Sequence, residues 1–294
     1  MILDDALSAP LLDHKALDLD GAECITYRLE QTFRYDYDLP VAKVRQRLVV
    51  VPPVRHGDLH RRHYALDVEG SRARPRERLT SVGNHLVEVH AARVDEHIEF
   101  RLTALLERDG DALPVLPRSA LQDSRWRLPT RLTAADERLR GWAAELRRPR
   151  ETTLDTAERV CHAVHRTMTY EYGPTGTRTT AAEALDGGRG VCQDYAHIML
   201  ALCHELGVPA RYVSGHLLGQ GGTHAWVEVL VAADGAAVAV PFDPCNGRRA
   251  GRKYVTVATG RDYTDVAPTA GTYVGPATGR LTSSRRLGIV DVAA

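Results

Sequence analysis

A cysteine at position 192 lies between a Gly-Val pair and an amphipathic run, in the stretch GRGVCQDYAHIMLALCHELG. From Cys192 onward, apolar residues recur at the spacing of one helix face, which predicts a helix that begins at this cysteine and ends at Gly207. The free N–H groups and the dipole at a helix N-terminus stabilise a thiolate, the nucleophilic form of cysteine. Gly188 and Gly190 would let the backbone approach a substrate closely. Cys192 is therefore a candidate nucleophile, whereas Cys203 lies on the apolar face and fits core packing.

A cysteine nucleophile needs a base, and the base needs an acceptor that orients it. His224 begins the predicted strand THAWVEVLV, and Asp243 ends the strand AAVAVPF at the turn FDPCNG. If these strands form an antiparallel hairpin, both residues lie at its open end, which predicts that they are neighbours. A helix packed on this sheet would add Cys192. Taken singly, each residue also fits a structural role: a core cysteine, a histidine at a strand start, and a turn-initiating aspartate before proline.

Two domains are predicted from the change of pattern along the chain. Residues 20–112 carry alternating or apolar runs such as ECITYRLEQTFRY, QRLVVVPP and HIEFRLTALLER, which predict an all-β, sandwich-like domain. Residues 130–271 carry helical patterns (TAADERLRGWAAELRR, TTLDTAERVCHAVHRTM) followed by three strands, which makes the whole chain α+β. Residues 272–294 are expected to form a partly loose C-terminal tail. The histidines of the first domain are scattered without metal-ligand spacing, at positions 56, 60, 63, 85, 90 and 97.

The composition of the 294 residues excludes several classes of protein. The net charge is zero and the sequence pI is about 7.2, so no basic surplus points to nucleic acid or to an anionic membrane. The five cysteines are odd in number and irregular in spacing, which does not fit a disulfide framework. The N-terminus lacks the basic start and apolar centre of a secretory signal, and no apolar run approaches the length of a membrane span. We therefore expect a reduced, cytoplasmic protein.

Three blocks together resemble the transglutaminase-like superfamily, over roughly residues 152–271: RGVCQDYAHIMLALCHELGVPARYVSGHL, HAWVEVLV and FDPCNG. The segment GRDYTDVAPTAGTYVG resembles the bacterial branch, and the strands around SVGNHLVEVHA resemble the β-domain that precedes the core in many bacterial members. The resemblance implies a papain-like core in which the helix that carries the cysteine packs on an antiparallel sheet. It also implies that Cys192 is the nucleophile, His224 the general base and acid, and Asp243 the residue that orients His224.

The resemblance also bears on metals and on the neighbouring thiols. Cys245 stands where members commonly have threonine after the Asp-Pro pair, and we give it no catalytic role. A metal site built from Cys192, Cys245, His224 and Asp243 is disfavoured, since the family uses no catalytic metal and no CxxC or HxxxH pair is present. Cys161 and His165 lie four apart on a predicted helix and fit structural roles. We expect no metal, no cofactor and no calcium requirement.

The chemistry that the resemblance implies is acyl transfer through a thioester, on a peptide bond or a glutamine side chain of a peptide or protein substrate. The backbone N–H of Cys192 would hold the oxyanion, with a second donor sought in residues 169–177, which include Tyr170 and Tyr172. A peptidase or amidase is favoured. The alternatives are a transamidating enzyme, an inert papain-like binding module, and a β-domain that docks a partner for the core to act on. The sequence leaves the oligomeric state open.

Overall fold

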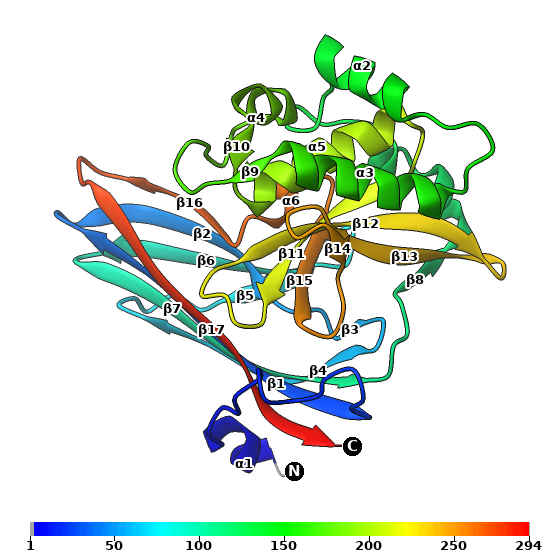
Figure 1. Ribbon diagram of the computed structural model, residues 1–294. Coiled ribbons are helices and arrows are strands. Elements are labelled where there is room, and N and C mark those ends of the chain that lie inside the picture. The colour runs from blue at the N-terminus through cyan, green and yellow to red at the C-terminus, as the bar shows by residue number, and fades with distance from the viewer. Residues whose placement is uncertain (1–2, 294) are drawn as a thin grey trace.

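The computed structural model describes residues 3–293 as a β-sandwich joined to an α/β core (Figure 1). The order of the larger sandwich sheet is β17-β1-β7-β4-β3, formed by Gly279–Ala293, Cys24–Tyr37, His97–Asp109, Leu59–Glu69 and Arg55–His56. The order of the second sheet is β16-β2-β6-β5, formed by Thr269–Val274, Val41–Val51, His85–Val94 and Arg76–Leu79. Side chains such as Leu29 of β1 and Val87 of β6 are fully buried in one apolar core. The predicted sandwich-like domain is confirmed.

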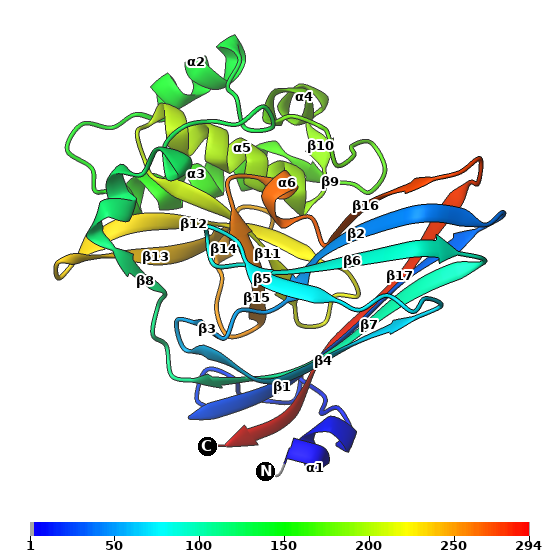
Figure 2. The ribbon, with the colours of Figure 1, turned by 180° about the vertical axis from the view of Figure 1, so that it is seen from behind.

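The core has an antiparallel sheet, as predicted, with helices on one face (Figures 1 and 2). Its strand order is β14-β13-β12-β11-β15, and β8 also pairs with β13. The bounds of these strands are β14 Arg248–Arg249, β13 Ala236–Asp243, β12 His224–Ala233, β11 Ala210–Leu217, β15 Tyr254–Gly260 and β8 Val115–Pro117. The covering helices are α2 Glu137–Leu146, α3 Thr153–Thr167, α4 Ala181–Gly187 and α5 Cys192–Glu205. The remaining elements are short: α1 Leu3–Ser8, η1 Arg118–Gln122, η2 Ser124–Trp126, β9 Thr169–Tyr170, β10 Arg189–Gly190 and α6 Tyr263–Val266. None of the helices within residues 3–293 is long and apolar enough to cross a membrane.

Helix α5 confirms the prediction of a helix that begins at Cys192. Its residues from Gln193 to Cys203 are all buried, because the sheet lies on one side of the helix and α2, α3 and α4 lie around the rest. Gly207 takes the left-handed conformation (φ 77°) just after the helix, as the sequence predicted for a terminating glycine.

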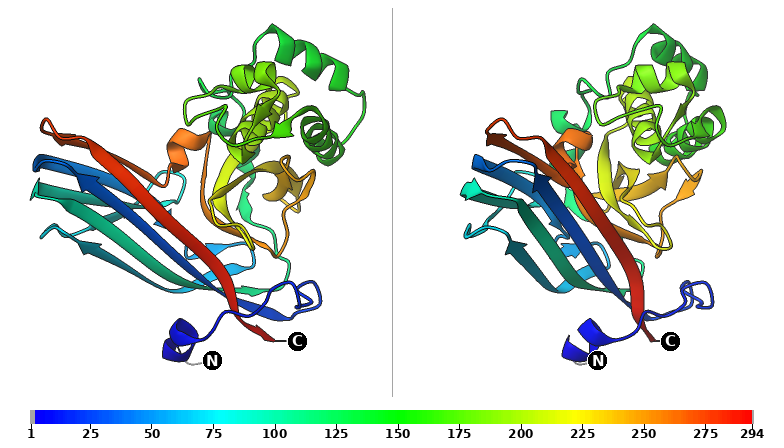
Figure 3. Two further views of the ribbon diagram at one scale, coloured as in Figure 1. Left: turned by 60° about the vertical axis from the view of Figure 1, so that its left-hand side comes forward. Right: turned by 90° about the vertical axis from the view of Figure 1, so that its left-hand side faces the viewer.

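The core sheet is buried on both faces. On β12, the alternation predicts Ala225, Val227 and Val229 on one face, and these side chains pack in the same apolar core as α5. Trp226 lies on the other face in a small cluster with Tyr254, and it too is buried. Figure 3 shows why: the helices cover one side of this sheet and the β-sandwich lies against the other.

The C-terminal segment corrects the expectation of a loose tail over residues 272–294. Strand β17 pairs with β1 from Cys24↔Ala293 to Tyr37↔Gly279, and β16 pairs with β2, so the segment supplies an edge strand to each sandwich sheet. Residues 287–290 of β17 are buried, whereas residues 279–284 are exposed. That polar first half, GRLTSSRR, obscured the strand in the sequence. Strand β4 was also missed, because its run LHRRHYALDVE is dominated by charged and half-exposed side chains.

The two domains are joined by buried polar contacts. The buried Asn84 side chain of the β-domain donates from Nδ2 to the Thr259 carbonyl (2.7 Å) and accepts the Thr259 N–H at Oδ1 (2.9 Å). His56 contacts the buried Glu228 carboxylate at 2.6 Å, and Arg211 pairs with the same carboxylate at 2.6 Å. These contacts fix the β-domain against the second face of the core sheet.

Replacing Asn84 tests this joint. In Asn84→Ala, the N–H and C=O of Thr259 lose their partners inside the interface, and each unpaired buried group costs about 1–3 kcal/mol. We expect the free energy of unfolding in urea to fall by about 2–4 kcal/mol. The exposed His90 on β6 gives a matched control: His90→Ala should change the free energy by less than about 0.5 kcal/mol. An Asn84→Ala loss equally small would show that the joint does not stabilise the fold.

Candidate active site

Cys192 is the first residue of α5 and is partly exposed. The preceding residue is Val191, whose apolar side chain cannot accept a hydrogen bond from the free N–H groups of the first turn. The carboxylate of Asp194 instead accepts the Val191 N–H at 2.8 Å and the Thr175 hydroxyl at 2.6 Å. The first turn of α5 is therefore tied to the loop before α4, and Cys192 at its start is partly exposed.

The glycines before Cys192 serve the local backbone. Gly188 takes the left-handed conformation (φ 63°) that ends α4. At Gly190, a Cβ would collide with the Asp194 carboxylate. The structure thus gives both glycines a folding reason in place of the expected close approach to a substrate.

His224 and Asp243 lie side by side, as the hairpin predicted. Strands β12 and β13 pair in antiparallel register, with Val227 opposite Phe242, so the start of one strand meets the end of the other. Nε2 of His224 donates to Oδ2 of Asp243 at 2.7 Å, and both side chains are buried. The geometric prediction is confirmed, while the catalytic roles stay predictions.

The charges of this pair are coupled to Cys192. Burial alone would lower the pKa of His224, but hydrogen bonds with Asp243 and Cys192 raise it to about 9. Burial alone would raise the pKa of Asp243, but the bond to His224 and further bonds from Asn246 and Tyr254 hold it below its ordinary value. The pair therefore favours an imidazolium next to the Cys192 sulfur at neutral pH.

Three residues around the pair were missed in the sequence. Asn246 Nδ2 donates to Asp243 Oδ2 at 2.6 Å, and the Tyr254 hydroxyl donates to the same oxygen at 2.7 Å. The Trp226 ring stacks on the His224 ring, with centroids 6.2 Å apart and an interplanar angle of 27°. Asn246 could have been suspected from its place in the turn FDPCNG. Tyr254 carries no local signal, because it reaches Asp243 only through sheet pairing.

Cys245 lies beside the candidate site, as expected. Its N–H donates to Asp243 Oδ1 at 2.9 Å, and its thiol pKa is raised, mainly by burial and then by the charges of Asp243 and Cys192. The raised pKa favours the protonated thiol of Cys245 at neutral pH. In residues 169–177, where a second oxyanion donor was sought, Tyr170 is 60% exposed and Tyr172 is 90% exposed. Burial, and then Cys192, raises the pKa of the Tyr170 phenol.

The other cysteines and the helical histidine fit structural roles. Burial raises the pKa values of Cys161 and Cys203 to about 12, which keeps both as thiols. Nδ1 of His165 is hydrogen-bonded to the Cys245 carbonyl at 3.0 Å, so it supports the turn after Asp243 and does not pair with Cys161. Among the described residues, no group of three or more His, Cys, Asp or Glu side chains is arranged to hold a metal ion.

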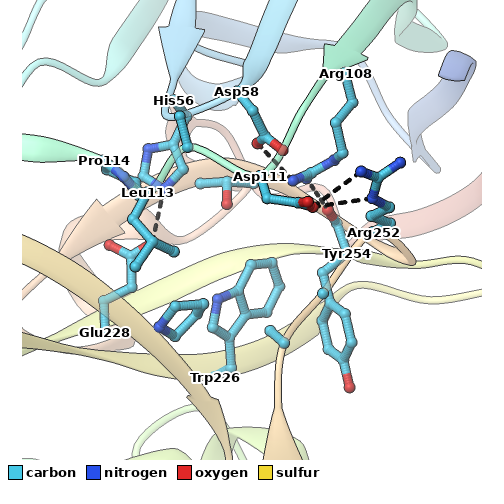
Figure 4. Close-up of a pocket in the computed structure, with 15 residues that line it drawn as sticks. His56, Asp58, Arg108, Asp111, Leu113, Pro114, Trp226, Glu228, Arg252 and Tyr254 are labelled. Atoms are coloured by element: carbon cyan, nitrogen blue, oxygen red, sulfur yellow. Dashed lines mark hydrogen bonds and ion pairs between the residues drawn. The ribbon is translucent and has the colours of Figure 1, made fainter. Parts of the chain in front are cut away.

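A cavity of about 220 Å³ is lined by residues of both domains (Figure 4). Asp58 and Arg108 of the β-domain lie on one side of it, and Trp226 and Tyr254 of the core on the other. The two aromatic residues whose rings lie near His224 thus also line this cavity.

Comparisons with known proteins agree with this architecture. The model of the transglutaminase-like superfamily core matches residues 140–244, and that of the bacterial transglutaminase-like N-terminal region matches residues 27–107. The chain belongs to the transglutaminase-like superfamily. The core match includes Cys192, His224 and Asp243, and the N-terminal match falls on the β-sandwich.

Relatives and a solved structure extend this finding. The chain is 38% identical over 118 residues to the uncharacterized protein ML0607 of Mycobacterium leprae, covering 37% of this chain and 40% of that protein. It is 31% identical over 145 residues to the uncharacterized protein Rv2569c of Mycobacterium tuberculosis, covering 45% and 46%. The match thus spans less than half the length of these curated relatives. A crystal structure of a proposed cysteine protease from Cytophaga hutchinsonii aligns over 91% of both chains, with a TM-score of 0.73 and 20% identity, and shows that the two-domain fold is shared.

An isosteric change at Asp243 tests the coupling of the charges. In Asp243→Asn, burial of His224 is no longer opposed by a carboxylate, so we expect its pKa to fall from about 9 to below the ordinary 6.5. In the wild type, the raised pKa of His224 contributes stability that is full below about pH 6.5 and is lost as the pH rises through about 9. This loss should be absent in the variant. NMR titration of the His224 ring measures the first effect, and urea unfolding across pH the second.

Asp109→Asn supplies a matched control, because Asp109 contacts His60 at 3.2 Å at the protein surface. It should leave the His224 titration unchanged. A His224 pKa near 9 in Asp243→Asn would contradict the role assigned to the carboxylate.

Proposed function

We propose that this protein is a cysteine-dependent acyl-transfer enzyme that cleaves an amide through a thioester, as a peptidase or amidase on a peptide or protein substrate. The observation that carries the proposal is the buried 2.7 Å bond between His224 and Asp243, in a hairpin that presents the histidine to a cysteine at a helix N-terminus. This is the arrangement of nucleophile, base and orienting acceptor that thiol acyl transfer requires.

In the proposed reaction, the His224 imidazolium stabilises the Cys192 thiolate, which attacks the carbonyl carbon of the amide. The oxyanion that forms is held by the Cys192 backbone N–H, one of the uncapped groups at the start of α5. His224 then gives its proton to the leaving amine, and the C–N bond breaks as the thioester forms. In the second half, His224 takes a proton from water, the hydroxide attacks the thioester, and the acid and the thiolate are released.

Exposure around the nucleophile favours water over an amine as the acceptor. Cys192 itself is partly exposed, and the tyrosines of the neighbouring segment are 60% and 90% exposed at Tyr170 and Tyr172. A transamidating enzyme has to limit the access of water to its thioester. The open surroundings of Cys192 therefore support hydrolysis.

Alkylation by iodoacetamide tests the proposal without a known substrate. Peptide mass spectrometry should follow each cysteine between pH 5 and 9, with glutathione as the reference thiol. We expect Cys192 to react at pH 6–7 at least tenfold faster than glutathione, because the adjacent imidazolium favours the thiolate. His224→Ala should remove this advantage, and the exposed-histidine variant His90→Ala should retain it.

Hydrolysis of a peptide library provides the functional readout. Cys192→Ser should lose turnover by at least 10²-fold, in line with the usual contribution of an activated nucleophile and its base. If Cys192 reacts no faster than glutathione, or if only Cys245 is modified, the triad is not assembled for chemistry and the inert binding module becomes the better explanation.

A further inference from the structure

The Asp243 carboxylate accepts five hydrogen bonds. Oδ2 accepts from His224, Tyr254 and Asn246, at 2.7, 2.7 and 2.6 Å. Oδ1 accepts the backbone N–H groups of Cys245 and Asn246, at 2.9 and 3.2 Å. Three of these bonds come from Cys245 and Asn246, in the turn that follows Asp243. Tyr254 instead reaches the carboxylate from β15, which pairs with β11 and not with β13.

Tyr254 is held at both of its ends. Its phenol oxygen accepts from Nε of Arg248 at 3.1 Å, which leaves its own proton for Asp243. Its backbone carbonyl accepts from Arg108 of the β-domain at 2.8 Å, and Arg108 is paired with Asp58 at 2.6 Å. Figure 4 shows Arg108 and Asp58 beside the backbone of Tyr254 and the hydroxyl on the opposite side, away from the cavity.

We propose that Tyr254 is a positioning residue for the His224–Asp243 pair, and that Arg108 of the β-domain holds β15 where the phenol can reach Asp243. The proposal rests on the proposed function, since it assigns a task to residues that contact the candidate triad. It gives the β-domain a direct part in the site: a chain of contacts runs from Asp58 through Arg108 and Tyr254 to Asp243.

The packing around His224 explains why one hydroxyl matters. The Tyr254 ring lies 5.9 Å from the His224 ring at 53°, and the Trp226 ring lies 6.2 Å from it at 27°. The two aromatic rings restrict the imidazole, so its orientation follows the carboxylate that it contacts. Without the Tyr254 hydroxyl, Oδ2 of Asp243 loses the one donor that, among the described residues, comes from outside the hairpin and its turn, so the orientation of the carboxylate is less firmly held.

Several titratable or charged groups act on Asp243 from the elements around it: His224 on β12, Tyr254 on β15, Cys161 on α3 and Cys245 in the turn, with Cys192 on α5 acting through His224 and Arg248 through Tyr254. Hydrogen bonds from His224, Asn246 and Tyr254 lower the pKa of Asp243 against the effect of burial. Removing the Tyr254 hydroxyl should therefore raise the pKa of Asp243 and weaken its hold on the imidazolium in mildly acid solution.

The test compares Tyr254→Phe with the wild type in the alkylation of Cys192 by iodoacetamide from pH 5 to 9. We expect the acid limb of the profile to move to higher pH, with alkylation at pH 6 slowed about tenfold, as for the loss of a hydrogen bond to a charged group. The matched control is Tyr35→Phe, which removes a 2.8 Å bond between Tyr35 and Thr269 inside the β-domain. This control should keep the wild-type profile even if its thermal stability falls.

Arg108→Lys tests the part played by the β-domain, because a lysine cannot contact Asp58 and the Tyr254 carbonyl with the fixed geometry of a guanidinium. We expect a shift in the same direction as for Tyr254→Phe but smaller, and no further slowing when the two changes are combined. A wild-type profile in Arg108→Lys would overturn the contribution of the β-domain.

The outcomes separate this inference from the proposed function. If wild-type Cys192 is no more reactive than glutathione, both fail. If the wild type is reactive and Tyr254→Phe keeps its profile, with or without a lower melting temperature, Tyr254 is merely structural and only the present inference is overturned.

Discussion

The buried carboxylate of Asp243 is the constraint on which the site depends. An ionised carboxylate with no exposure to water is costly unless donors surround it. The fold supplies these donors from three directions: the partner strand β12, the turn after β13, and the more distant strand β15. The register of the sheet, the turn geometry and the contact with the β-domain therefore have to be correct together before His224 is held in place.

The need to surround buried polar groups with partners also explains why both faces of the core sheet are covered. The apolar face lies under α5 and brings Cys192 to the hairpin end, whereas the opposite face carries Trp226 and Glu228. Glu228 has its pKa lowered to about 2, because Arg211 and His56 outweigh the effect of burial. Charged and aromatic groups on this face are tolerated because the β-domain provides partners and excludes water. The β-domain thus completes the core and is more than an attached module.

The sequence predicted the elements whose signals are local. The amphipathic run after Cys192, the alternation of β12 and the turn at Asp243 each lie within about 15 residues, and together they placed the three candidate residues. The contacts and elements that the sequence did not predict depend on pairing between strands that are far apart in the chain. Tyr254 contacts Asp243 only because β15 pairs with β11, and the polar residues 279–286 become a strand only because β1 is present to pair with them. Arg108 belongs to an alternating strand, where nothing distinguishes an arginine that contacts the other domain from one that faces water.

The pairing of β17 with β1 has a consequence for how the protein is made. The partner of residues 24–37 is residues 279–293, so the larger sandwich sheet lacks its edge strand until these residues, more than 240 positions further along, have left the ribosome. Synthesis proceeds at about 5–20 residues per second, so β1 waits many seconds with an open edge. The core emerges during this interval, and the contacts of Arg108 with Asp58 and Tyr254 involve only residues made before β17, so the joint between the domains can form while this edge is still open. Until β17 pairs, the unpaired N–H and C=O groups along β1 are open to strands of other chains, so this edge is where a nascent chain is most exposed to aggregation.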